Sequence, residues 1–235
     1  MIGRLLEGIS TEKFRSILCL DGDLRNLANV YDMFRLPLIA ADGAANQIID
    51  AGLAPDLIIG DLDSVDPNLL LRFDHLKLAD QNTSDFQKAI GYSKENELLP
   101  CIILGMSGGN IDHILNNFNI FLEEDGNVFF DGNIVGFNCV GPKKTHLKLP
   151  VDTKLSILGI PGCNLTTHGL KWELEPSDLA FATYPPNSRI FGYNSCFNRT
   201  VMEDITIEIK SGTALLLIYL STVMDAGSGL DHAEK

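Results

Sequence analysis

Short apolar runs alternate with segments of helical periodicity over the first 130 or so residues. The runs predict buried strands at 16–20, 37–42, 56–63, 75–80 and 101–105. Between them, apolar residues spaced three or four apart predict helices at 24–34, 44–52, 84–96 and 110–125. Ser84 is expected at or near the N-cap of the third helix, and Ile111, Leu115, Phe118 and Leu122 form one stripe of the fourth. The alternation predicts a doubly wound, mostly parallel sheet with helices on both faces.

The pattern changes after residue 133, where short strand-like runs follow one another without a helical segment. They lie at 133–140, 146–150, 154–160, 164–170, 178–184, 188–194, 205–210 and 214–220, and Gly, Pro and Asn separate them. This spacing is typical of an all-β unit, a sandwich or a barrel. We therefore expect an α/β domain at 1–138, a β domain at 139–223 and a flexible, Gly-rich tail at 224–235.

Composition narrows the class of protein. The chain has 235 residues, 45% of them hydrophobic, which suits one large or two small domains with a buried core. With 31 acidic and 18 basic residues, its formal charge of −13 disfavours nucleic acid and anionic lipid as partners. No apolar run approaches the roughly 18 residues of a membrane helix, and no signal peptide is recognised. The five cysteines are widely spaced without a CxxC pair, which predicts reduced thiols in a cytoplasmic protein rather than a zinc site.

Carboxylates follow most of the predicted parallel strands. Asp42 ends the second strand, Asp61 and Asp63 end the third, and Asp80 ends the fourth, just before Gln81, Thr83 and Asp85. The fifth strand leads into the glycine-rich turn "MSGGN", which opens a helix that carries Asp112 and His113. Ligands of open parallel sheets bind at the carboxyl ends of the strands, so these groups are expected at one edge.

Clustered carboxylates repel one another unless a cation lies between them, and Mg²⁺ prefers oxygen ligands in the company of phosphates. A glycine-rich turn at a helix N-terminus offers backbone N–H groups to an anion. Together these features indicate phosphoryl-group chemistry. Each residue also has a plainer interpretation: a single Asp can be a turn or cap residue, Lys88 an i,i+3 partner of Asp85, and Trp172 part of a β-core.

Three blocks of the sequence resemble the signature blocks of the thiamine pyrophosphokinase family, in the same order and at similar spacing. They are "ADGAANQIIDAGLAPDLIIGDLDSV", "DQNTSDFQKAI" and "GMSGGNIDHILNNFNIF". A fourth block, "GLKWEL" at 169–174, lies in the β-rich half, and the resemblance covers residues 17 to 220. It implies an α/β domain followed by a β-sandwich, a homodimer with the active site at the subunit interface, and pyrophosphoryl transfer from Mg-ATP to thiamine, with AMP as the second product.

The resemblance also implies roles for individual residues. Asp42, Asp61, Asp63 and Asp85 would bind Mg²⁺, and the catalytic set would be Asp61, Asp63, Asp85 and Asp112, with Asp112 or Asp85 as the base. Substrate contacts would come from Asp42, Gln81, Thr83, Lys88, Ser107, Gly108, Gly109, His113, Trp172 and Asn198. Asn198 matches the Asn of a Ser-Asn block that holds the thiamine pyrimidine.

The chain departs from the family pattern at three positions. Asn110 replaces the arginine of the usual "GGRxDH" block, and Lys88 or Arg199 are the candidates to supply its positive charge. Phe197 stands where the Ser of the Ser-Asn block is expected, and Ala44 replaces a Gly.

Three other functions remain open from the sequence. "DLDSV" also fits the DxDx[T/V] nucleophile motif of haloacid-dehalogenase-type phosphatases, although that motif normally follows the first strand. A pyrophosphokinase could instead act on another alcohol, such as a pterin. A non-catalytic thiamine or nucleotide sensor is the third, but a sensor has no need of several clustered carboxylates.

Overall fold

The computed structural model of the chain describes residues 13–181 and 194–220, so the predicted tail and most of the predicted strand at 188–194 lie outside the described residues. The first half contains the following elements: β1 Ser16–Cys19, α2 Leu27–Phe34, β2 Leu38–Ala41, α3 Ala44–Asp50, β3 Leu57–Gly60, α4 Pro67–Leu70, β4 His75–Lys77, α5 Asp85–Glu95, β5 Cys101–Leu104, α6 Ile111–Glu123 and β6 Val128–Asp131. The sequence analysis anticipated these except the short α4 and β6.

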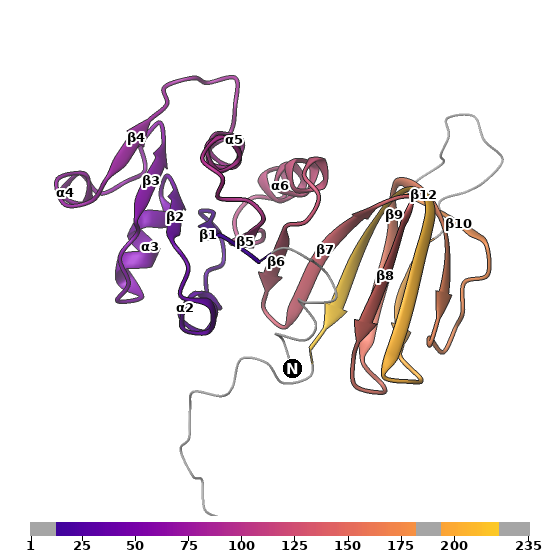
Figure 1. Cartoon of the computed structure of the whole chain (residues 1–235). Coiled ribbons are helices and arrows are strands. Elements are labelled where there is room, and N and C mark those ends of the chain that lie inside the picture. Colours follow the sequence, from indigo (N-terminus) through magenta and orange to yellow (C-terminus); the bar gives the residue numbers. More distant parts are fainter. Residues whose placement is uncertain (1–12, 182–193, 221–235) are drawn as a thin grey trace, which may run out of the picture.

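Six parallel strands form the α/β half, in the order β4-β3-β2-β1-β5-β6. Side chains alternate between its two faces. Ile17 and Cys19 belong to a buried cluster with residues of α2 and α3, whereas Leu18 and Leu20 pack in a second cluster with α5 and α6. Helices therefore cover both faces (Figure 1), which confirms the doubly wound fold.

Helix α6 differs from the prediction in which residues it buries. Ile120 and Phe121 are buried, but Ile111 and Leu115, at the start of the predicted stripe, are 69% and 62% exposed. The first turns of α6 line a pocket at the sheet edge with Asp112, His113, Asn116 and Asn117, and only its later turns pack over the strands. Here Phe121 meets Phe129 of β6 edge-on, with ring centroids 5.1 Å apart.

The β-rich half comprises β7 Ile134–Val140, β8 Lys143–Lys148, β9 Lys154–His168, β10 Ser177–Ala180, β11 Ser195–Arg199 and β12 Asp204–Tyr219. Two pairs of predicted strands are each one continuous strand. β9 takes in the strands predicted at 154–160 and 164–170, and β12 takes in those predicted at 205–210 and 214–220. β12 pairs with β8 along its first part and with β7 along its second, and its register with β9 shifts near Gly212. A Cβ at Gly212 would lie 2.1 Å from the Gly162 carbonyl oxygen, so this close crossing requires glycine.

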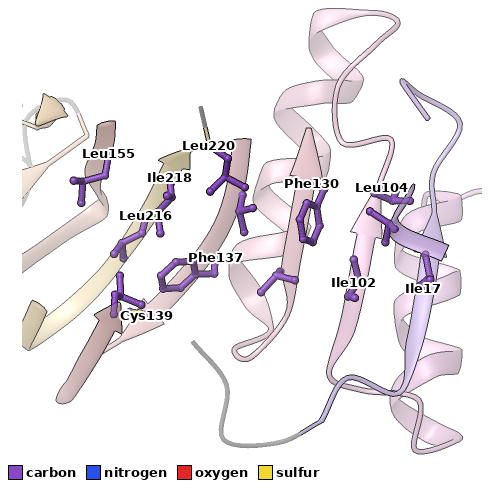
Figure 2. Close-up of a cluster of buried hydrophobic side chains, with 14 of the residues drawn as sticks. Ile17, Ile102, Leu104, Phe130, Phe137, Cys139, Leu155, Leu216, Ile218 and Leu220 are labelled. Carbon is purple, nitrogen blue, oxygen red and sulfur yellow. The ribbon is translucent and has the colours of Figure 1, made fainter. Parts of the chain in front are cut away.

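Hydrophobic packing is continuous between the two halves. Figure 2 shows buried side chains from β1, β5 and β6 followed by Phe137 of β7 and Ile218 of β12. β6 and β7 form an antiparallel hairpin that joins the parallel strands to the β-rich ones, and the predicted boundary at 138/139 falls inside β7. The division into two domains stays a prediction. No helix among the described residues is long and apolar enough to cross a membrane.

Helix α5 carries four residues of the pocket lining, and a capping box fixes its start. The Ser84 hydroxyl accepts from the Gln87 backbone N–H, and the Gln87 side chain accepts from the Ser84 N–H at 3.0 Å. We expect Ser84→Ala to lower the free energy of unfolding by about 1 kcal/mol, because helix N–H groups lose their partner. Ser84→Asp keeps an acceptor and is expected to stay near wild type. Urea unfolding measures both, and equal losses in the two variants would contradict the capping role.

Candidate active site

A pocket of about 910 Å³ lies at the carboxyl edge of the parallel strands. The strand order reverses between β1 and β5, which is where ligands of doubly wound sheets bind. Most of the residues that line it follow one of the strands β1 to β5 or lie on α5 and α6. They include most of the predicted site residues: Asp42, Asp61, Gln81, Thr83, Asp85, Lys88, Gly108, Gly109, Asp112 and His113. Asp63, Ser107, Trp172 and Asn198 do not line it.

Three carboxylates converge in this pocket. Asp42, Asp61 and Asp85 each offer an oxygen atom, and these atoms lie within 4.8 Å of one another. Asp42 is only 5% exposed, and its Oδ1 is buried without a hydrogen-bond partner among the described residues. Such an oxygen is costly to bury unless something outside the protein binds it. The donor set, all oxygen and all anionic, fits Mg²⁺.

The local environment shifts the pKa values of two of these carboxyl groups in opposite directions. Burial raises the pKa of Asp42, and although the Ser64 hydroxyl opposes the shift, the carboxylates of Asp85 and Asp61 add to it. The Gln81 amide donates from Nε2 to Asp61 Oδ2 at 2.9 Å, and this hydrogen bond lowers the pKa of Asp61. The carboxylates of the cluster thus repel one another, and a bound cation would reduce this repulsion.

Backbone geometry explains why Asp61 joins the cluster and Asp63 does not. Leu62, between them, has a φ of 65°, and Asp42 has a φ of 45°. Both values lie in the left-handed region, which non-glycine residues seldom adopt. The turn at Leu62 separates the two neighbouring acids. Asp63 accepts a hydrogen bond from the Ser64 hydroxyl at 3.0 Å instead.

Among the described residues, Lys88 is the only lysine or arginine that lines the pocket. Its side chain is 5% exposed, and its Nζ lies 3.0 Å from Asp85 Oδ1. Arg199, the other candidate for the missing arginine, is in the β-rich half and pairs with Asp152 at 2.6 Å. The structure therefore places Lys88, rather than Arg199, beside the three carboxylates.

The glycine-rich turn after β5 also lines the pocket. Gly108 and Gly109 have φ values of 90° and 91°, and a Cβ at Gly108 would lie 2.7 Å from the backbone nitrogen of Asp23. The side chain of Asn110, the N-cap residue of α6, makes no capping hydrogen bond, and in the first turn Asp112 Oδ1 accepts from the His113 N–H. The first N–H groups of a helix have no intrahelical partners, so this end of the pocket suits an anion.

Several polar residues at the site were not predicted from the sequence, among them Asp21 and Asn46. Asp21, after β1, lines the pocket and accepts a hydrogen bond from Gln47 Nε2 at 2.8 Å. Asn46 donates to the Ser64 carbonyl at 2.8 Å and accepts from the Asp66 N–H at 2.9 Å, which holds the loop after Asp61. The signal for Asp21 was present, because "SILCLDG" repeats the pattern of an apolar run followed by Asp-Gly seen at Asp42.

The predicted residues of the β-rich half form a separate group. Trp172 is 55% exposed, whereas Asn198 is 1% exposed. Asn198 Nδ2 donates to the Trp172 carbonyl at 2.7 Å and to Ser195 Oγ at 3.2 Å, and its Oδ1 accepts from the Trp172 N–H. Ser195 thus supplies a hydroxyl beside Asn198, where Phe197 leaves none. Phe197, with a φ of 55° on a β-bulge, packs against Tyr219.

Most of the α/β half matches the model of a known protein family. The family model described as "Thiamin pyrophosphokinase, catalytic domain" matches residues 35–130. This segment contains the three carboxylates, Lys88 and the glycine-rich turn. Thiamine pyrophosphokinase 1 of Arabidopsis thaliana is 27% identical over 234 residues, covering 83% of this chain and 81% of the relative. Thiamine pyrophosphokinase 3 of Oryza sativa subsp. japonica is 27% identical over 192 residues, covering 65% and 70%.

Solved structures share the fold along nearly the whole chain. Yeast thiamin pyrophosphokinase superposes with a TM-score of 0.71 at 18% identity, covering 94% of this chain and 92% of the yeast chain. Thiamine pyrophosphokinase from Bacillus subtilis gives a TM-score of 0.72 at 16% identity, covering 88% and 100%. The catalytic-domain match covers most of the pocket residues, and the similarity to thiamine pyrophosphokinases extends across both halves of the chain.

Proposed function

We propose that this protein is a thiamine pyrophosphokinase, which transfers the pyrophosphoryl group of Mg-ATP to the hydroxyl group of thiamine and releases AMP. The supporting observation is the convergence of Asp42, Asp61 and Asp85 with Lys88 in one pocket. These residues lie within the segment that matches the catalytic domain of the family.

The pocket residues suit in-line attack on the β-phosphorus of ATP. Asp42, Asp61 and Asp85 would hold Mg²⁺, which supplies positive charge to the phosphate oxygens when bound. Gly108 and Gly109, with the backbone N–H groups at the start of α6, would bind a phosphate group, while Lys88 would balance negative charge beside the carboxylates. Most of the rate enhancement would come from alignment and charge stabilisation.

Asp112 is the better candidate for the base that accepts the thiamine hydroxyl proton. Both Asp112 and Asp85 line the pocket. Asp85, however, is engaged by Lys88 at 3.0 Å and belongs to the cation site. Asp112 lies outside that cluster on the first turn of α6, and its Oδ1 accepts a hydrogen bond from the neighbouring His113 N–H.

A product assay tests the proposal. Purified protein with Mg-ATP and thiamine is expected to form AMP and thiamine diphosphate in equal amounts, and neither without thiamine. Phosphate or ADP formed without thiamine would support the phosphatase interpretation instead. That interpretation has little structural support, because its DxD motif needs both Asp61 and Asp63, and Asp63 does not line the pocket. Failure with thiamine, but AMP formation with a pterin alcohol, would reassign the acceptor. Ligand binding without AMP release from either acceptor would indicate a sensor.

We further propose a homodimer in which the β-rich half of one chain completes the pocket of the other. Trp172 and Asn198 do not line the pocket of their own chain. Exposed apolar residues occur both on α6, beside the pocket, and around Trp172 and Phe197. Burying such residues between subunits would stabilise the pair. A cytoplasmic location is proposed as well, in keeping with free thiols at all five cysteines.

Subunit complementation tests the shared site. Lys88→Met and Trp172→Ala chains, co-expressed with different tags, would form a heterodimer with one doubly altered and one unaltered site. We expect about half of the wild-type activity at low thiamine, although each variant alone is nearly inactive there. Activity of the heterodimer no greater than the mean of the two variants would refute a site shared between subunits.

A further inference from the structure

Ser107 precedes the two glycines of the anion-binding turn but does not face the pocket. Its Oγ donates a hydrogen bond to Asp131 Oδ1 at 2.8 Å. Asp131 is the last residue of β6 and does not line the pocket either. The Ser107 hydroxyl thus has a partner inside the protein, and its contact with the nucleotide stays a prediction.

The segment before the glycines is held at several points. The Ser107 carbonyl accepts from the Asp23 N–H at 2.6 Å, and the Met106 carbonyl accepts from Asn117 Nδ2 at 3.3 Å. By contrast, nothing lies within 4 Å of a Cβ built at Gly109. The turn is thus anchored up to Ser107 and open from Gly109 onward, where its N–H groups meet the pocket.

Hydrogen bonds also hold the two residues that follow Asp131. The next residue, Gly132, accepts a hydrogen bond from Nδ2 of the buried Asn26 at 2.7 Å. Asn133 then exchanges hydrogen bonds with Leu220 at the end of β12. Arg25, which pairs with Asp23, also interacts electrostatically with Asp131 and offsets its negative charge near the anion site.

We propose that Asp131 is a positioning residue for the nucleotide: by holding Ser107 Oγ, it fixes the Gly108–Gly109 turn in the shape that binds a phosphate group of ATP. The inference rests on the proposed function and assigns a task to two side chains that do not touch substrate. Residues that only support a binding group commonly change affinity or activity by about 10–100-fold.

The test compares Asp131→Ala, Ser107→Ala, their double variant and Asp131→Asn in the full-length protein. Nucleotide binding is measured by calorimetry with Mg²⁺ and α,β-methylene-ATP, which cannot be cleaved between its α- and β-phosphorus atoms, in the absence of thiamine. We expect each alanine variant to weaken binding about 10-fold, and the double variant to be no worse than either, because both remove the same hydrogen bond. Asp131→Asn retains an acceptor oxygen and is expected to bind nearly as well as wild type.

Steady-state kinetics and a control separate positioning from general stability. The KM for ATP should rise in the alanine variants while the KM for thiamine stays unchanged, and Asp125→Ala, which removes an exposed ion pair with Lys143, should alter neither. Lower thermal stability with unchanged analogue affinity would overturn the proposal, as would additive losses in the double variant or failure of Asp131→Asn to restore binding. If wild type forms no thiamine diphosphate but shows the Asp131-dependent binding, the positioning role stands, and the proposed function fails in its acceptor alcohol or in its catalytic activity.

Discussion

Replacing Asp42 with Asn is expected to lower turnover by on the order of 100-fold or more and, at the same time, to stabilise the metal-free protein. Asn keeps the volume and tolerates the left-handed φ of 45° at this position. It removes one of three converging negative charges, and its amide can donate to Asp61 or Asp85. Activity therefore falls because a cation ligand is lost, whereas stability rises because repulsion is lost.

The stability gain should depend on pH in a defined direction. The folded-state pKa of Asp42 is raised above its ordinary value of 3.8. As the pH rises from 3.8, the unfolded chain releases this proton first, so the wild type loses stability until the pH passes the folded pKa. Asn does not titrate. The difference in unfolding free energy between Asp42→Asn and wild type should be smallest below pH 3.8 and fully present above the raised pKa.

Thermal unfolding with and without Mg²⁺ measures both effects. Without the ion, a gain of about 1 kcal/mol would raise the Tm by about 2–4 °C. With it, only the wild type should gain a further Mg²⁺-dependent increase. Asp74→Asn is the control, because Asp74 is an exposed acid at the amino end of β4, away from the pocket. An Mg²⁺-induced shift of wild-type size in Asp42→Asn would remove Asp42 from the cation site.

Replacing Lys88 with Met is expected to have the second large effect. Here kcat/KM and the free energy of unfolding should both fall. Met keeps the apolar stem but leaves Asp85 without its cation, beside Asp42 and Asp61. The loss of a positive group next to the phosphates is expected to lower kcat/KM for ATP by about 10²–10³-fold. The unpaired carboxylate should cost about 1–3 kcal/mol, because Asp85 retains partial contact with water.

Lys94→Met provides a matched comparison on the same helix. Lys94 is exposed and pairs with Glu124 at 2.5 Å, outside the pocket. Exposed ion pairs contribute little, so we expect a change in stability under about 1 kcal/mol and unchanged kinetics. Similar kcat/KM values for Lys88→Met and Lys94→Met would show that another group compensates for the arginine replaced by Asn110.

The strand ends and one helix start were predictable because their signals are local. A buried strand needs a continuous apolar run, and the residue after that run must emerge at the carboxyl edge, as Asp42 and Asp61 do. The capping box at Ser84 likewise depends on residues only three apart. The continuity of β9 and β12 was not predicted, because glycines within these strands were interpreted as breaks although the strand pairing continues past them.

The sequence by itself determined the doubly wound half, the edge at which the carboxylates gather and the identity of most pocket residues, because these follow from strand order and periodicity. Only the tertiary structure decided which side chains meet there. It turned Asp63 away through the backbone at Leu62, placed Lys88 rather than Arg199 in the pocket, and directed Ser107 to Asp131. The reason is physical: the direction of a side chain depends on backbone dihedrals and on partners distant in the sequence, and neither is encoded in a local pattern.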